Sequence, residues 1–174
     1  MLLVERHYIK GNEEIIRLCK LSKELYNRCN FLMRQAWFNK KQLPNISILY
    51  KTCQELDCFK DFNNTKIPTQ TIRKCLSDWS NYLKAIKSYK KDKTKFISFP
   101  KPPNYKNKLN QIIFHNATIK GGQSKSKQQL ATLTANNNCF SVPYKEGYKQ
   151  IRITPKTFGF IIEIQYETKE QPKK

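Results

Sequence analysis

Residues 68–87 read PTQTIRKCLSDWSNYLKAIK, and the rest of the chain can be arranged around this segment. Its large apolar side chains recur mostly at intervals of three and four residues, the spacing that places them on one face of an α-helix. Pro68 suits the first turn of a helix, where its missing N–H leaves no hydrogen bond unmade. The opposite face carries Arg73, Lys74, Lys84 and Lys87. The segment therefore predicts a basic amphipathic helix whose apolar face needs a core.

Two further helical patterns precede this segment. Asn12 can cap a helix whose first turn holds Glu13 and Glu14, and its apolar period continues to about residue 38. Ser47 can cap a shorter helix that ends near Lys60. Because each helix has a single apolar face, the three are expected to form a bundle.

A lysine-rich stretch with interleaved aromatic residues follows the basic helix. We call residues 96–110 the strap; Phe96, Phe99 and Tyr105 alternate there with lysines. The whole chain has 33 Lys and Arg against 13 Asp and Glu, a formal net charge of +20. This excess favours a polyanionic partner, with nucleic acid ahead of acidic lipid. Tyr105 and the later loop residue Tyr144 are candidates for stacking on bases, whereas Trp79 is assigned to the core.

After the strap the hydrophobic period changes from 3.6 to 2, which indicates β-structure. Strands are predicted at residues 111–119, 139–142, 150–154 and 158–167, and residues 120–138 are expected to form a long hairpin or insertion. In the last strand, Phe158 and Phe160 begin the inward-facing set. Residues 3–10 form an opening strand with no strand beside it before residue 111, so it should pair with the later ones. The predicted fold class is therefore α+β: a β-barrel interrupted by an inserted three-helix bundle.

The acidic residues do not form a catalytic set. A metal-dependent nuclease needs carboxylates that converge on metal ions. After Asp92 only Glu146, Glu163, Glu167 and Glu170 remain, and the last three are assigned to a solvated surface. We expect no catalytic residue in this chain.

Histidines and cysteines do not suggest a metal site either. His7 and His115 each stand alone in a predicted strand, and Cys53 and Cys58 have no second close pair to complete a zinc site. The six cysteines, without a signal peptide or a run of about 18 apolar residues, indicate reduced thiols inside a cell and no membrane span. Three of them, Cys19, Cys29 and Cys75, lie on apolar helical faces and are assigned to the core.

Five segments resemble the N-terminal portion of the TnpB (OrfB) proteins of bacterial insertion sequences, which are relatives of the type V CRISPR effector nucleases. They are the first strand MLLVERHYIK (1–10), LSKELYNRCNFLMRQAW (21–37), PTQTIRKCLSDWSNYLKAIK (68–87), KFISFPKPPNYK (95–106) and QIRITPKTFGFIIEIQYE (150–167). The resemblance implies an OB-like β-barrel, called the wedge domain, interrupted by a helical recognition domain. It places the first wedge strand at 1–11, the recognition domain at 12–95, the strap at 96–110 and the rest of the wedge at 111–168. Residues 169–174 would be a basic tail or a truncated linker to a missing RuvC-like domain.

The family resemblance also implies a function. Full-length members are RNA-guided DNA endonucleases whose catalytic carboxylates and zinc ribbon lie in the RuvC-like part. This chain is expected to bind a guide RNA derived from the transposon end and double-stranded DNA beside the target, with a separate RuvC-like polypeptide as a further partner. Alone it would not be an enzyme, and magnesium and zinc are expected only in the missing C-terminal domains. A cytoplasmic, nucleoid-associated location in a bacterial or viral-type system follows.

The expected contact residues fall into two groups. Lys66 and Gln70 match family positions that contact target-adjacent DNA, and Tyr50, Arg73 and Lys74 complete the expected DNA-binding set. The expected RNA-binding set is Lys84, Lys87, Lys90, Lys101, Tyr105, Lys106, Lys108 and Arg152. The sequence leaves one alternative open, namely a fragment of a decayed transposon or a structural protein that binds polyanions without a specific activity.

Overall fold

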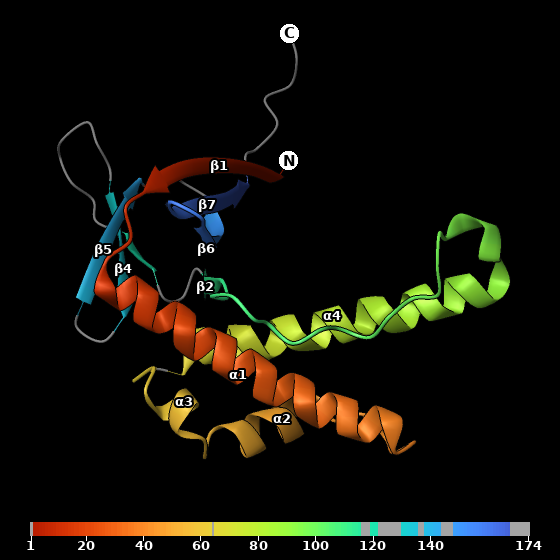
Figure 1. Ribbon diagram of the computed structural model, residues 1–174. Helices are drawn as coiled ribbons and strands as arrows, with labels where there is room; N and C mark the ends of the chain where they lie inside the picture. The colour runs from red at the N-terminus through yellow and green to blue at the C-terminus, as the bar shows by residue number, and fades with distance from the viewer. Residues whose placement is uncertain are drawn as a thin grey trace, which may run out of the picture.

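The computed structural model describes residues 2–63, 65–115, 119–121, 130–135, 138–143 and 148–167 (Figure 1). Strand β1 (Leu2–Ile9) leads into the helices α1 (Glu13–Phe38), α2 (Ile46–Cys53), α3 (Asp57–Lys60) and α4 (Lys66–Lys91). A 3-10 turn, η1 (Lys93–Lys95), precedes the strap. The strands after the strap are β2 (Ile112–His115), β3 (Ile119–Gly121), β4 (Leu130–Ala135), β5 (Asn138–Pro143), β6 (Tyr148–Lys156) and β7 (Gly159–Glu167). The fold is mixed α+β, as predicted.

The strands described form two antiparallel sheets. One has four strands in the order β1-β7-β6-β2, and the other has three in the order β3-β4-β5. The opening strand pairs with the last one, which confirms that expectation, and all the helices are inserted between the two edge strands β1 and β2. Within the described ranges the four-stranded sheet is open, so the closed barrel stays a prediction.

The β7 register corrects one inward-facing assignment. Phe160, Ile162 and Ile164 are buried in the core as predicted, but Phe158 is 99% exposed. The strand begins one residue later, at Gly159, because the chain turns there between β6 and β7. Gly159 has a φ of 131°, and a Cβ on it would lie 2.7 Å from the carbonyl oxygen of Ile9. The turn therefore needs a glycine at this position.

The stretch 120–138 contains part of the second sheet. Strand β4 lies within it and pairs with β3 on one side and with β5 on the other. The sequence analysis predicted no strand within 120–138, and its single strand at 111–119 is wrong, because β2 and β3 are separate strands that belong to different sheets. Residues 122–129, Tyr144, Glu146, Glu170 and the expected tail 169–174 lie outside the described residues.

The first helix begins and ends as the sequence predicts. Asn12 Oδ1 accepts a hydrogen bond of 2.8 Å from the Ile15 amide, and Glu14 pairs with Arg17 within the first turns. At the other end Lys40 has a φ of 54°, and the Lys41 amide donates to the Ala36 carbonyl at 2.8 Å. This is a Schellman-type stop, made here without glycine.

The second predicted helix, 47–60, is wrong as a single element. Asn45, and not Ser47, caps α2, since its Oδ1 accepts from the Ile48 amide at 3.0 Å. The chain then leaves helical geometry at Leu56, with φ −76° and ψ 141°, before the short α3. The break turns Phe59 and Phe62 into the core, where 5% and 0% of their surfaces are exposed. Burial of two aromatic side chains outweighs continuity of the helix.

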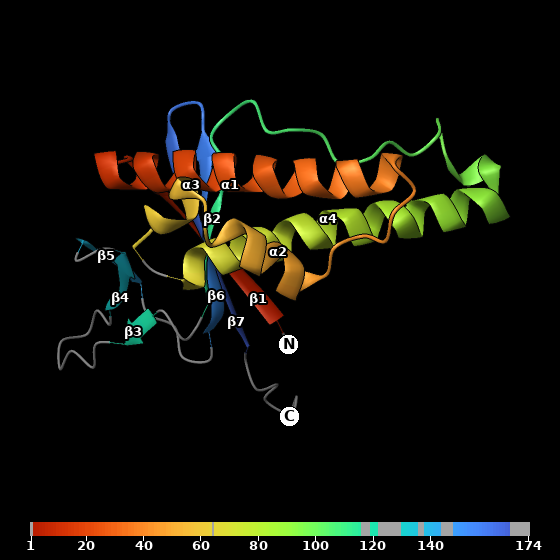
Figure 2. The same cartoon turned by 90° about the horizontal axis from the view of Figure 1, so that it is seen from below.

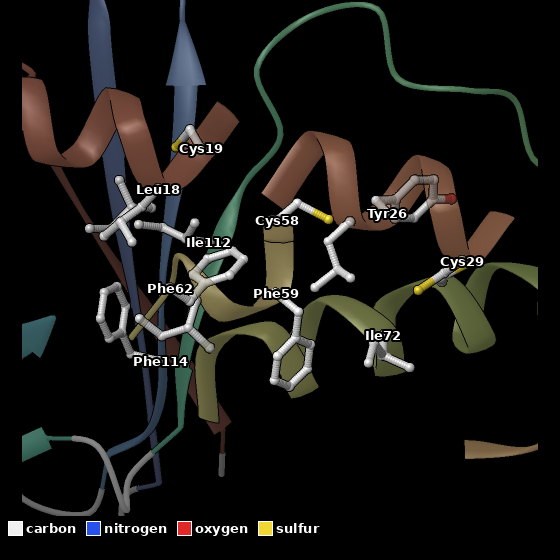
Figure 3. Packing of buried hydrophobic residues seen from close by; sticks show 14 of the residues in the cluster. Leu18, Cys19, Tyr26, Cys29, Cys58, Phe59, Phe62, Ile72, Ile112 and Phe114 are labelled. Carbon is white, nitrogen blue, oxygen red and sulfur yellow. The ribbon is translucent and has the colours of Figure 1, made fainter. Parts of the chain in front are cut away.

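Helices and sheet share one hydrophobic core. Figure 3 shows Leu18 of α1 and Ile72 of α4 in the same cluster as Ile112 and Phe114 of β2. Trp79 is 1% exposed, as assigned from sequence, and its Nε1 donates to Asn30 Oδ1 at 2.9 Å. On the predicted apolar face of α4, Ile72, Cys75 and Trp79 are buried, while Leu76, Leu83 and Ile86 pack against the cluster at its margin.

Five cysteines are free and buried, namely Cys19, Cys29, Cys53, Cys58 and Cys75. Burial raises the pKa of the Cys19 and Cys75 thiols to about 12, so they stay neutral in the core. The Sγ atoms of Cys29 and Cys53 lie 3.4 Å apart as a weak hydrogen bond between α1 and α2. The assignment of Cys19, Cys29 and Cys75 to the core is confirmed.

Candidate nucleic-acid interface

The outer face of α4 carries one continuous polar stripe. Its members are spaced alternately by four and three residues, so they lie one above another along the helix. All are exposed except Gln70, which is half-buried. The stripe consists of Lys66, Gln70, Arg73, Ser77, Ser80, Lys84, Lys87 and Lys91. At about 1.5 Å per residue it is roughly 37 Å long, and we call it the α4 stripe.

The stripe is strongly cationic. Arg73, Lys84, Lys87 and Lys91 have no acidic partner within 4 Å among the residues that the structure describes. Two predicted groups, the DNA-binding Lys66, Gln70 and Arg73 and the RNA-binding Lys84 and Lys87, thus share one face of one helix. The sequence analysis placed Arg73, Lys84 and Lys87 on the same polar face, and the structure confirms that they share it.

Lys74 lies off the stripe and is already neutralised. Its ammonium pairs with the carboxylate of Asp78, which also accepts a hydrogen bond of 2.8 Å from the Tyr26 hydroxyl. Burial, followed by this bond to Asp78, raises the pKa of Tyr26. The Lys74–Asp78–Tyr26 group ties α4 to α1, which is a packing role different from the predicted contact with DNA.

Tyr50 is half-buried on α2 and packs its ring edge to face against Phe59, with ring centroids 5.5 Å apart. Together with Lys60 and Thr65 it lines a hollow beside the start of α4. Tyr50 thus shares this hollow with Thr65, the residue that precedes α4, while its ring packs against the margin of the core.

The strap runs back along the helices toward β2 (Figure 2) and is fixed there by side-chain amides of α1. Asn27 donates to the Lys106 carbonyl at 2.9 Å and accepts from the Lys106 amide at 2.7 Å. Asn30 and Arg34 both donate to the Pro103 carbonyl, at 3.0 and 2.9 Å. A segment without regular secondary structure thus has a defined course.

The predicted strap residues differ in how free they are. The Lys101 and Lys108 side chains are exposed. The Lys106 ammonium lies 4.6 Å from the centre of the Tyr26 ring, and the Arg34 guanidinium lies 5.4 Å from that of Tyr105. Both are cation–π contacts between α1 and the strap, and they hold the strap in place while Lys106 and Arg34 keep their positive charges.

The far end of α4 carries Lys90 together with an aromatic cluster. Tyr89 packs edge to face against Phe96 and Phe99, at centroid distances of 5.6 and 5.2 Å. Phe99 remains 56% exposed, and Ile97 is fully exposed. Lys90 is therefore placed beside apolar surface at the tip of the arm that Figure 1 shows projecting from the body.

Arg152 stands apart from the other predicted contacts. It lies on β6, directly opposite Glu163 of β7, and its Nη1 is 3.4 Å from a Glu163 oxygen. Arg6 of β1 contacts the other Glu163 oxygen at 2.9 Å. Glu163 is therefore paired with two guanidiniums, whereas the sequence analysis assigned it to a solvated surface. The same pairing leaves the charge of Arg152 partly neutralised.

One feature was missed by the sequence analysis: a groove between α1 and the strap. It has a volume of about 830 Å³ and includes Lys20, Lys23, Arg28, Phe31 and Tyr105 among its lining. Of these only Tyr105 was predicted to bind. The sequence did contain a sign of this groove, because Phe31 is apolar but out of phase with the buried face of α1. In the structure its side chain is 47% exposed.

In the described part of the chain, no group of three or more His, Cys, Asp or Glu side chains is arranged to hold a metal ion. None of the described helices combines the length and the apolar composition that crossing a bilayer requires.

The sequence matches no protein-family model, and a search of curated proteins likewise finds no match. Any functional assignment therefore rests on the residues and their geometry.

Proposed function

We propose that this chain is a nucleic-acid-binding module of the TnpB/OrfB type, which binds guide RNA and target-adjacent DNA and does not itself cut. The observation that carries the proposal is the α4 stripe, in which the exposed cations Arg73, Lys84, Lys87 and Lys91 have no acidic partner within 4 Å among the described residues. Such a row is costly to assemble in an isolated protein because like charges repel. A polyanion that supplies phosphates along the stripe would relieve this repulsion.

The dimensions of the stripe suit a nucleic acid. Its length of roughly 37 Å is comparable with one helical turn of duplex DNA, about 34–36 Å. Contacts between lysines and phosphates give affinity without choosing a sequence. Gln70, near the start of the same stripe, adds an amide that can donate to and accept from one base edge. The stripe therefore combines affinity along its length with base reading at one end.

The finer architecture is proposed with it. The four-stranded and three-stranded sheets would be parts of a wedge-type OB-like β-barrel that holds the RNA. Catalysis, with its magnesium and zinc, would belong to a separate RuvC-like polypeptide, and the complex would act in the cytoplasm on the nucleoid.

Salt dependence tests the polyanion part of the proposal. If about six phosphates are contacted, the slope of log K against log salt should be near −4 for single-stranded RNA and about −5 for duplex DNA. Lys84→Ala should reduce the slope by about 0.7 to 0.9, whereas Lys156→Ala, which removes an exposed lysine at the end of β6, should not. A slope near zero for the unaltered chain would rule out the proposal.

Sequence selection tests the base-reading part. The chain is used to select duplexes from a pool randomised over about ten base pairs, and the enriched positions are compared between variants. Gln70→Ala should flatten the preference, because one bidentate amide contact is worth about 1–3 kcal/mol of discrimination. Lys84→Ala should weaken binding to every sequence and keep the preference. No enrichment by the unaltered chain would leave only nonspecific polyanion binding and would contradict the assignment of Gln70.

A further inference from the structure

The groove between α1 and the strap differs from the α4 stripe in shape and chemistry. It is a hollow of about 830 Å³ and not a row of side chains, and its lining combines aromatic, amide and basic groups. Lys20, Lys23, Arg28 and Phe31 recur at helical spacing and therefore share one face of α1. Tyr105, Asn107 and Leu109 supply the wall contributed by the strap.

The strap wall is held in position before any ligand arrives. The paired hydrogen bonds between Asn27 and the Lys106 main chain, 2.7 and 2.9 Å long, fix the residue that follows Tyr105. Arg34 donates to Pro103 on the other side and places its guanidinium against the Tyr105 ring. A wall fixed in this way loses little conformational entropy on binding.

Two aromatic side chains of the groove remain open to solvent. Phe31 is 47% exposed and Tyr105 is 48% exposed, although each is adjacent to well-packed elements. Large apolar surface in a hollow is the usual mark of a binding site, and aromatic faces bind the flat faces of nucleobases.

The charges around the groove match a phosphate. Lys20, Lys23 and Arg28 have no acidic partner within 4 Å among the described residues, and Glu24 is the single acidic residue of the lining. Asn107 is exposed on the strap and offers an amide that can reach a base edge. Base, phosphate and amide contacts are thus available in one place.

We propose that this α1–strap groove binds an unstacked nucleotide of a single-stranded nucleic acid, with the base against Phe31 and Tyr105 and its phosphate among Lys20, Lys23 and Arg28. The inference rests on the proposed function, and it adds the kind of strand that is bound. A paired base is covered on both faces by its neighbours and cannot offer a face to an aromatic side chain. Duplexes would therefore use the α4 stripe, and single strands or unpaired loops would use the groove as well.

The test measures binding of octanucleotides of RNA and of DNA that carry one 2-aminopurine, with a 20-base-pair duplex for comparison. Phe31→Ala should lower affinity for the single strands about 5- to 100-fold, leave the duplex unchanged and leave the salt slope unchanged, because stacking releases no counterions. Phe31→Trp should preserve the affinity. Phe158→Ala, which removes a fully exposed phenylalanine from the β6-β7 turn, is the matched control and should have no effect.

Lys23→Ala should act differently, reducing both the affinity and the salt slope for single strands by one phosphate contact, about 0.7 in slope. The RNA and DNA octamers distinguish the two sources of single strand. If the unaltered chain binds the octamers with a steep salt slope but Phe31→Ala binds them equally well, the groove assignment is wrong and the proposed function stands. Equal losses of affinity for single strands and duplex in Phe31→Ala would also overturn the groove assignment. Absence of salt-dependent binding by the unaltered chain would instead remove the proposed function.

Discussion

The turn between β6 and β7 depends on a single glycine. Gly159 opens β7 with a φ of 131°, a region that residues with a Cβ rarely adopt, and the added carbon would lie 2.7 Å from the Ile9 carbonyl oxygen. We expect Gly159→Ala to lower the free energy of unfolding by about 1–3 kcal/mol, measured by urea denaturation. Thr157→Ala, in the same turn and exposed, should change it by less than about 0.5 kcal/mol. Equal urea midpoints for the two variants would show that the turn tolerates a side chain.

The Glu14–Arg17 pair should make stability depend on pH. Two hydrogen bonds of 2.7 and 2.8 Å from Arg17 hold the pKa of Glu14 below its usual value, against a smaller opposing effect of burial. Because the folded-state pKa is below the unfolded value of about 4.3, the contribution is complete above about pH 4.3 and is lost as the pH falls through the folded pKa. Glu14→Gln should therefore lower the free energy of unfolding, measured by urea denaturation, by up to about 1 kcal/mol at pH 7 and by almost nothing at pH 2.

Glu13→Gln is the control for that measurement. Glu13 is exposed in the same helical turn and has no ion pair with any residue that the structure describes, so it experiences the same helix dipole without the arginine. If both variants lost the same stability at pH 7, the helix dipole and not the ion pair would be the cause.

At the scale of elements, the strap depends on α1 for its course. Asn27 makes both of its hydrogen bonds to the Lys106 main chain, in the manner of a neighbouring strand. Asn27→Ala should speed hydrogen exchange of the Lys106 amide and cost about 1–3 kcal/mol, because a carbonyl and an amide lose their partners. Asn81→Ala, an exposed asparagine on α4, should leave that exchange rate unchanged. Unaltered exchange in Asn27→Ala would mean that other contacts fix the strap.

The same elements show how far sequence reasoning extends. The cap at Asn12, the apolar face of α4 and the insertion of helices between strands depend on local spacing, which is visible in the sequence. Contacts between Asn27 or Asn30 and the strap join residues far apart in the chain, and no local pattern encodes them. The same holds for the break at Leu56, where tertiary burial of Phe59 and Phe62 overrides helical continuity.

The candidate site shows the same division. Arg73, Lys84 and Lys87 could be identified from the polar face of a predicted helix, and the structure leaves them exposed. Lys74 could not be separated from them, because its pairing with Asp78 depends on where Tyr26 of α1 approaches. Phe31 was overlooked for a related reason: its partner surface, the strap, is supplied by a distant segment.

At the scale of the whole molecule, the shared core should make unfolding a single event. Buried residues of α1, α3, α4, β2, β6 and β7 belong to one cluster. Phe114→Ala removes a fully buried side chain from β2 and should cost about 3–5 kcal/mol. Tryptophan fluorescence, which reports on Trp37 and Trp79 in the helices, and circular dichroism of the whole chain should shift to the same lower midpoint. Separate midpoints would reveal helices and sheet as independent units.

The pairing of β1 with β7 bears on how the protein is made. Ile9 lies opposite Phe160 and Leu2 opposite Glu167, so the first strand to be synthesised must wait for nearly the whole described chain. At about 5–20 residues per second that delay is about 8–30 s, while α1 and α4 can already pack on each other. During this time β1 presents Leu2, Leu3 and Val4 on a strand whose backbone groups have no partner. Nascent chains should therefore be most prone to aggregation, and most dependent on chaperones, in the interval before residue 159 emerges from the ribosome.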